Sequence, residues 1–299
     1  MSLRKPQRLD RKDERVAYLF ISVPVILFVL FMLIPICAAF YLSFTDYDVV
    51  HKPGWVGLAN FQKLLKDEFF WICLKNTVYY TLLYVPLGLL ASLLSALFLN
   101  CKRKVANLFR TFYYIPVLCS TVATATLWFW ILNPQLGLLN KVLELFGISG
   151  PAWLYNSRTA MISIVIMSVW AKFGYYMMIF LAGLKGIPSA LYECAQLDGA
   201  GKFTTFRKIT MPALSKTTFL VSTLLIIDAF QVFDQAFVLT RGGPGNATIT
   251  LVYYIYNNGF KNLKMGYASS ISIVLFFMIA IMSYINMKLN KTEDDGGIM

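Results

Sequence analysis

Long apolar runs separated by polar segments dominate the chain. Six runs reach the length of about 20 residues that a helix needs to cross a bilayer. They cover residues 16–44, 77–99, 109–132, 159–181, 217–239 and 265–287. Because lipid offers the backbone no hydrogen-bond partners, such runs must form helices. The pattern predicts an all-α polytopic membrane protein with six transmembrane helices.

The first run is unusually long, at 29 residues, and contains Pro24 and Pro35. We expect it to tilt or kink, or to extend past the membrane. Its apolar core exceeds the 7–15 residues of a typical signal peptide, and no small-residue cleavage site follows it. It is therefore expected to be a retained anchor.

Composition and charge support a membrane protein and orient it. Of the residues, 58% are hydrophobic and only 14% are charged, against about 25% charged in soluble domains. With both termini in the cytoplasm, 17 of the 27 lysines and arginines lie in inner segments and 9 in outer loops. This asymmetry follows the positive-inside rule, so the net charge of +12 needs no nucleic-acid partner. We predict a multi-pass protein in contact with membrane lipid, with cytoplasmic tails at 1–15 and 291–299 and one membrane domain at 16–290.

Residues that usually build metal or catalytic sites are few. The five cysteines include no Cys-x-x-Cys pair, and the lone histidine, His51, lies in an outer loop. We therefore expect neither a metal site nor a catalytic constellation. A second outer loop, 133–158, has apolar residues at helical spacing from Leu138 to Phe146 and predicts a short amphipathic helix.

A polar, basic insert at 185–216 separates the fourth and fifth apolar runs, and charge asymmetry places it inside. Pro188 suits the first turn of a helix over 189–197, and Gly199 suits its end. A second short helix is expected over about 201–208, with Pro212 starting the entry into the fifth run. By composition alone, the insert is best interpreted as an amphipathic connector resting on lipid headgroups.

Eight residues of this insert change that interpretation, because they resemble the cytoplasmic coupling loop of permeases in ATP-driven (ABC) importers. The pattern is Glu-Ala-Ala, two residues, Asp-Gly-Ala, then Ile and Pro. The matching positions are Glu193, Ala195, Asp198, Gly199, Ala200, Phe206, Ile209 and Pro212. Cys194 replaces the second residue of the pattern and Met211 the usual Leu, and both substitutions keep a small or apolar side chain.

Further stretches resemble the branch of these permeases that serves sugars. They include the segments 55–61, 113–116 and 239–244, so that the resemblance covers nearly the whole chain. It implies the type I importer fold, a second homologous permease, two ATPase subunits that bind ATP and Mg, an extracytoplasmic sugar-binding protein, and a bacterial or archaeal cell membrane. The chain itself lacks a phosphate-binding loop, since residue 196 is Gln and Phe203 follows Lys202. No cofactor is therefore expected in this chain.

A polar stripe in the fifth run marks a candidate substrate path. On a continuous helix, Asp228, Gln231, Asp234 and Gln235 fall within a sector of about 120°. Amides and carboxylates are suitable partners for sugar hydroxyls. The alternative is that these side chains bind neighbouring helices. The resemblance favours the path, because sugar contacts in the family come from this region.

Two other polar residues within apolar runs are candidates for the path. Lys172 lies in the middle of the fourth run, where it either contacts substrate or, as we prefer, pairs with Asp228 or Asp234. Thr124 shares a helix face with other polar residues of the third run.

We predict a non-enzymatic permease subunit of a carbohydrate importer. An ion-coupled secondary transporter is the alternative, although inverted repeats and broken helices typical of that class are not evident in the sequence. A membrane-embedded enzyme is disfavoured by the lack of a catalytic constellation.

Overall fold

The computed structural model describes residues 11–101 and 104–295, which fold into helices joined by loops, with one isolated β-bridge between Thr45 and Trp55. The predicted all-α class is confirmed. In chain order the helices are α1 (Arg11–Phe28), η1 (Val29–Leu33), α2 (Ile34–Leu42), α3 (Ala59–Lys66), α4 (Glu68–Leu99), α5 (Lys104–Leu118), α6 (Thr121–Ile131), α7 (Leu138–Leu145), α8 (Ser157–Lys185), α9 (Ser189–Leu197), α10 (Lys202–Thr205), η2 (Phe206–Thr210), α11 (Met211–Ala213), α12 (Ser215–Phe230), α13 (Asp234–Leu239), α14 (Leu251–Tyr256), η3 (Asn257–Lys261) and α15 (Met265–Asp295).

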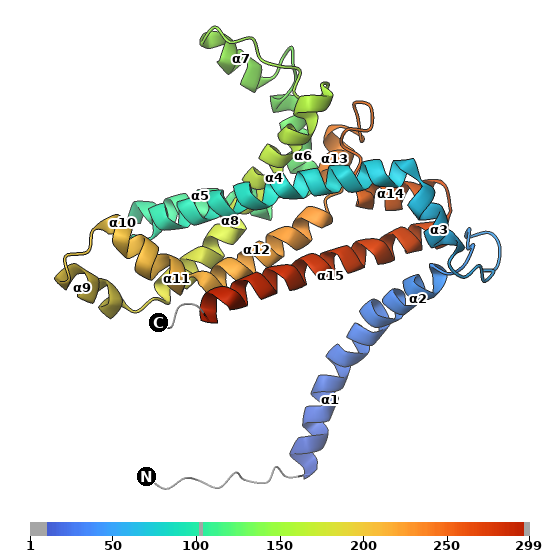
Figure 1. Ribbon diagram of the computed structural model, residues 1–299, viewed down its shortest axis with the longest axis horizontal. Helices are drawn as coiled ribbons and strands as arrows, with labels where there is room; N and C mark the ends of the chain where they lie inside the picture. Colours follow the sequence, from blue (N-terminus) through green and yellow to red (C-terminus); the bar gives the residue numbers. More distant parts are fainter. Residues whose placement is uncertain (1–10, 102–103, 296–299) are drawn as a thin grey trace.

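A bundle of α4, α5, α8, α12 and α15 forms the body of the molecule (Figure 1). Helix α8 lies at its centre, packed against α4, α5 and α12, and α12 also packs against α15. Large side chains such as Tyr80, Tyr176 and Phe180 fill the core. At Gly174 the backbones of α8 and α5 come so close that an added Cβ would lie 1.9 Å from the carbonyl oxygen of Tyr113. A small residue therefore sets this helix contact.

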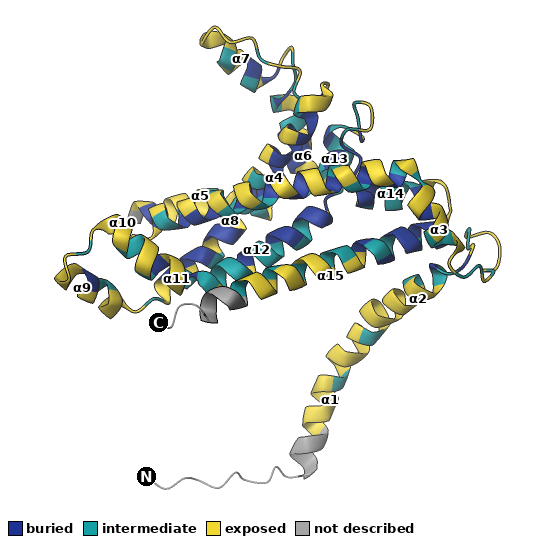
Figure 2. Ribbon diagram, in the orientation of Figure 1, coloured by how far each residue is buried: buried dark blue, intermediate teal, exposed yellow. Residues whose placement is uncertain are grey.

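The first apolar run leaves the bundle as an almost continuous helix, α1–η1–α2 (Figure 1). None of the residues in its most apolar window, between Val16 and Leu42, is buried, whereas 56% of the residues in the corresponding window of α8 are buried. Figure 2 shows the difference as an exposed surface along α1 and α2. The π-helical turn η1 ends just before Pro35, whose missing N–H interrupts the regular hydrogen-bond ladder. An apolar surface of this extent requires lipid or another chain as its neighbour.

The third apolar run is broken rather than continuous. Helices α5 and α6 meet at an angle of 101°, because Ser120 takes a non-helical conformation with ψ of 136°. Ser120 occupies the N-cap position of α6, which serine favours. The helix predicted over 109–132 is thus present as two helical segments with a bend between them.

The fifth run is broken as well. Helix α12 ends at Phe230, residues 231–233 are not helical, and α13 begins at Asp234, so the predicted continuous helix over 217–239 is wrong. At the other end, the segment Lys202–Ala213 meets α12 at 66°. Within residues 11–101 and 104–295, four helices are long and apolar enough to cross a membrane, or up to six if each bent pair is one span. The broken helices that we expected to be absent are thus present.

The remaining expectations concern an outer helix and the two tails. Helix α7 confirms the amphipathic helix predicted after residue 137. Helix α1 begins within the predicted tail 1–15, and α15 continues into the predicted tail 291–299. Residues 1–10, 102–103 and 296–299 lie outside the described residues.

Candidate functional site

A cavity of about 320 Å³ opens where α12 gives way to α13. Its walls come from α4, α6, α8, α12 and α13. The lining residues are Tyr80, Tyr84, Thr121, Lys172, Asp228, Gln231, Val232, Phe233, Asp234 and Gln235. All four residues of the predicted polar stripe therefore share one cavity, together with Lys172. The break in the helix, rather than the face of a continuous helix, brings them together.

Lys172 is paired with Asp228 inside this cavity. The ammonium nitrogen of Lys172 lies 3.0 Å from Oδ2 of Asp228, and the hydroxyl of Tyr176 donates a hydrogen bond to the same oxygen. Of the two partners that the sequence left open for Lys172, the structure selects Asp228. A charge within a transmembrane bundle is costly unless it is paired, so this contact stabilises both side chains where they lie.

Three other polar residues of the cavity have no such partner. Gln231 and Asp234 are exposed, and Gln235 is half-buried. Within the described residues, none of these side chains makes a hydrogen bond or ion pair with the rest of the chain. Their donors and acceptors are therefore free for a bound molecule.

Two aromatic side chains, Tyr80 and Tyr84, line the same cavity, and the sequence did not lead us to predict them as site residues. Tyr80 and Tyr84 are buried and stacked, with ring centroids 5.3 Å apart and planes inclined by 14°. They stand four residues apart in the second apolar run, a spacing that places them on one helix face. That spacing was the available signal.

The predicted path residue Thr124 does not line the cavity. It is buried, and its hydroxyl donates to the carbonyl of Ser120 at 3.0 Å, beside the break between α5 and α6. Thr121, three residues earlier on α6, lines the cavity instead.

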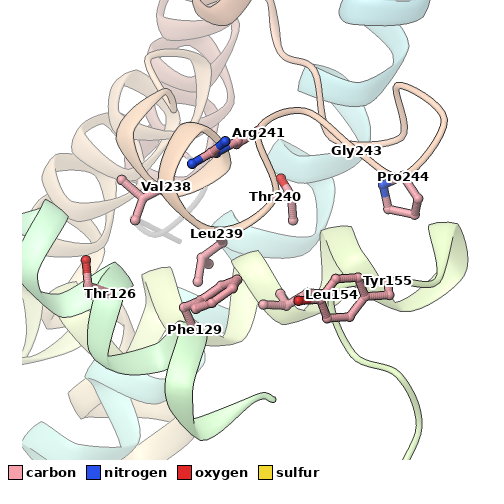
Figure 3. A pocket seen from close by; sticks show the side chains of 10 residues that line it. All are labelled: Thr126, Phe129, Leu154, Tyr155, Val238, Leu239, Thr240, Arg241, Gly243 and Pro244. Atoms are coloured by element: carbon pink, nitrogen blue, oxygen red, sulfur yellow. The ribbon is translucent and has the colours of Figure 1, made fainter. Parts of the chain in front are cut away.

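A second cavity, of about 520 Å³, also has residues of α6 and α13 in its walls (Figure 3). Phe129, Leu154 and Tyr155 form one side of it, and the loop from Thr240 to Pro244 forms the other. Arg241 is its one charged lining residue. Although it is larger, this cavity offers fewer polar groups to a sugar than the cavity at the α12–α13 break.

The predicted coupling loop forms a pair of short helices at one end of the bundle (Figure 1). Helix α9 has the predicted bounds. It ends in a Schellman motif, in which the N–H of Ala200 bonds the carbonyl of Ala195 at 2.9 Å and that of Gly199 bonds the carbonyl of Gln196 at 3.1 Å. Gly199 has a φ of +72°, which glycine adopts without steric cost. The Asp-Gly-Ala part of the motif is therefore a helix-ending device.

The second helix of the loop runs back from Lys202 to Ala213 through α10, η2 and α11. The hydroxyls of Tyr192 and Thr210 lie 3.1 Å apart and join it to α9, and Phe206 and Ile209 are half-buried. Pro212 lies inside this helix and does not begin the fifth span as predicted, because the chain turns only at Leu214.

Several side chains of this loop are exposed in the part of the chain that the structure describes. Glu193 and Asp198 are exposed, and neither has a side-chain partner among the described residues. Leu197 and Phe203 are 88% and 74% exposed. Apolar side chains that project so far from a loop mark a surface for interaction with another molecule. In the described part of the chain, no group of three or more His, Cys, Asp or Glu residues could hold a metal ion.

Comparison with known proteins places this architecture in a family. Residues 85–291 match the family of binding-protein-dependent transport system inner membrane components. The chain is 37% identical to the probable ABC transporter permease YesP of Bacillus subtilis (strain 168), over 96% of this chain and 94% of that one. It is 36% identical to the arabinooligosaccharides transport system permease AraP of the same organism, over 91% and 88% of the two chains. With the trehalose/maltose transport system permease MalF of Thermococcus litoralis the identity is 32%, over 96% and 98%.

A solved structure shares the fold. A chain of a bacterial ABC transporter involved in the import of the acidic polysaccharide alginate superimposes with a TM-score of 0.83 at 23% identity, over 94% of this chain and 96% of that one. The family match and the similar permeases, and not the breaks α5–α6 and α12–α13, distinguish an ABC transporter permease from a secondary transporter. The family match and the relatives agree with the coupling-loop pattern, and the chain belongs to the family of binding-protein-dependent transport system inner membrane components, the membrane-spanning permeases of ABC transporters.

Proposed function

We propose that this chain is a permease subunit of an ATP-driven carbohydrate importer. With a second, homologous permease it forms the path by which an oligosaccharide or sugar derivative, delivered by an extracytoplasmic binding protein, enters a bacterial or archaeal cell. The observation that carries the proposal is the cavity at the α12–α13 break, where three hydrogen-bonding side chains that are unpaired among the described residues meet two stacked tyrosines. Relatives named for arabinooligosaccharide and trehalose/maltose transport support carbohydrate as the substrate class.

The chemistry of the cavity suits a sugar. Hydroxyl groups both donate and accept hydrogen bonds, and the amides of Gln231 and Gln235 do the same, while Asp234 accepts. A neutral, hydroxyl-rich ligand can therefore exchange its hydrogen bonds with water for bonds with these side chains. Gln231, Asp234 and Gln235 are the proposed contacts.

The coupling loop transmits the movement of the ATPase subunits to this chain. In this proposal α9 docks on an ATPase subunit through Leu197 and the exposed motif residues Glu193 and Asp198, and two ATPases bind ATP and Mg. Closure of the ATPases moves α9 and, through the contact of Tyr192 with Thr210, the second helix that leads into α12. Helix α12 carries Asp228 and ends at the cavity, so motion of the loop reaches the substrate site. Both termini and the loop lie in the cytoplasm.

Transport measurements separate this proposal from the ion-coupled alternative. The chain is co-expressed with its partner permease, ATPase and binding protein, and the complex is reconstituted into vesicles. We expect sugar uptake that requires enclosed ATP and Mg and that stops when the binding protein is omitted. Uptake by this chain alone, driven by a proton or sodium gradient without ATP, would contradict the proposal.

A further inference from the structure

The formal charges of the side chains that line the α12–α13 cavity do not sum to zero. Lys172 contributes one positive charge, and Asp228 and Asp234 contribute two negative charges, so this chain gives the cavity a formal charge of −1. The other lining residues are uncharged. A cavity with walls of low dielectric keeps such a charge effective at short range.

The single positive group is not available to an anion. Lys172 lies 3.0 Å from Asp228, and Asp228 also receives the hydroxyl of Tyr176. The two partners keep 40% and 32% of their side-chain surface exposed, so the pair borders the cavity while remaining joined. An anionic ligand would gain Lys172 only by leaving the carboxylate of Asp228 without its counter-charge.

The remaining charge is the free carboxylate of Asp234. This residue is the first of α13 and is exposed, and its side chain has no hydrogen bond or ion pair within the described residues. Gln231 and Gln235 on either side of it are neutral and also unpaired. A sugar hydroxyl donates to this carboxylate, whereas a carboxylate, sulfonate or phosphate on the sugar meets a like charge.

We propose that this chain's wall of the cavity accepts uncharged, hydroxyl-rich sugars and rejects anionic sugars, and that Asp234 is the residue that makes the distinction. The inference rests on the proposed function, since it assumes that sugar passes this cavity. The fold does not determine whether uncharged or anionic sugars are accepted, because a transporter of the same fold takes part in the import of an acidic polysaccharide. The discrimination comes from the local charge.

The test uses the complete complex of both permeases and the ATPases, trapped with ATP and vanadate and without binding protein. Ligand binding is measured by saturation-transfer NMR with matched pairs of trisaccharides, one uncharged and one uronate, such as galactotriose and trigalacturonate, or maltotriose and its uronic counterpart. We expect wild type to prefer the uncharged member of a pair by about tenfold or more, and Asp234→Asn to reduce that preference by about tenfold. A tenfold change corresponds to about 1.4 kcal/mol.

Two controls isolate the charge of Asp234. Asp234→Glu keeps the charge and is expected to retain the preference. Asp48→Asn removes a carboxylate from the exposed outer loop and is expected to leave it unchanged. The yield and size of each complex show that it has assembled.

The possible results distinguish a failure of this inference from a failure of the proposed function on which it rests. If the uronate binds as well as the uncharged sugar, or if Asp234→Asn leaves the ratio unchanged, the inference is overturned while the sugar path stands. If neither member of any pair binds, the sugar path fails and the inference fails with it.

Discussion

In the cavity, Asp228 accepts hydrogen bonds from Lys172 and Tyr176, whereas in the coupling loop Glu193 and Asp198 have no partner in the described chain. The environment explains the difference. A carboxylate within the apolar bundle needs a counter-charge from its own chain, while a carboxylate on a water-facing loop is stable alone and can serve another protein. Asp234 lies in the same cavity as Asp228 but is exposed and unpaired among the described residues, so in this respect it resembles the carboxylates of the loop, and we propose that all three serve other molecules.

One glycine in the bundle and one in the loop are required for different physical reasons. Gly174 lies where two helix backbones touch, and a Cβ there would clash with Tyr113. Gly199 has open space around it but a positive φ. The first glycine is required by packing, and the second by the conformation that ends α9.

The largest effect is expected for Gly174→Ala. Its Cβ would lie 1.9 Å from a backbone oxygen, which no rotamer change relieves, so α5 and α8 must separate. Overpacking of this kind costs about 3 kcal/mol or more. We expect a strong loss of monodisperse protein and a lower melting temperature in detergent. Gly201→Ala is the matched control, because Gly201 has a φ of −66° and no atom within 4 Å of its added Cβ. Equal stability of the two variants would show that the helix contact at Gly174 is not tight.

A smaller effect is expected for Lys172→Met, which leaves Asp228 charged with only Tyr176 as a donor. Because both partners are partly solvated, we expect a destabilisation of about 1–2 kcal/mol rather than the larger cost of a fully buried pair. The measurement is thermal unfolding of the complex. The double variant Lys172→Met/Asp228→Asn removes both charges and should recover part of the loss. A double variant no more stable than Lys172→Met would argue against charge pairing as the cause.

Gly199→Ala is expected to act on coupling more than on the bundle. An alanine at a positive φ costs about 1–2 kcal/mol, and the Schellman motif would loosen without disturbing the helices of the bundle. We expect ATPase stimulation by loaded binding protein to fall severalfold while the melting temperature changes little. Gly201→Ala again serves as the control. Unchanged stimulation would show that the end of α9 need not be ordered for coupling.

The smallest effect concerns the N-terminal end of α4, where Asp67 joins α4 to α14 and α15. Burial raises the pKa of Asp67, but hydrogen bonds from the hydroxyls of Tyr254 and Tyr267 and from the N–H of Phe69 outweigh it and hold the pKa below its ordinary value. A lowered pKa means that these contacts stabilise the fold above about pH 4 and that their contribution is lost as pH falls through the folded value. We expect Asp67→Asn to lower stability by less than about 1 kcal/mol at pH 7. The difference from wild type should narrow toward pH 3, and a difference that grows on acidification would contradict this assignment.

The sequence predicted best those features that depend on local residues. Helix α9 was predicted because Pro188 and Gly199, only eleven positions apart, mark its two ends. The breaks at Ser120 and at 231–233 were not predicted, because an apolar run with helix-compatible residues carries no local signal that neighbouring helices will bend it. The cavity residues Asp228, Gln231, Asp234 and Gln235 were found together although the assumed helix geometry was wrong, since polarity in an apolar run identifies such residues whatever the backbone does. The pairing of Lys172 with Asp228 required the packing of α8 against α12, which no local pattern specifies.

The most direct test of the account is whether the exposed motif of α9 holds the ATPase. Tagged wild type, Glu193→Lys and the control Glu144→Lys, which reverses an exposed charge on α7, are purified in mild detergent and the accompanying chains are quantified. We predict that wild type and Glu144→Lys retain both a second permease and an ATPase, and that Glu193→Lys retains the permease but loses most of the ATPase. If Glu193→Lys retains the ATPase as fully as wild type, or if no ATPase accompanies the wild-type chain, the account of the coupling loop is contradicted.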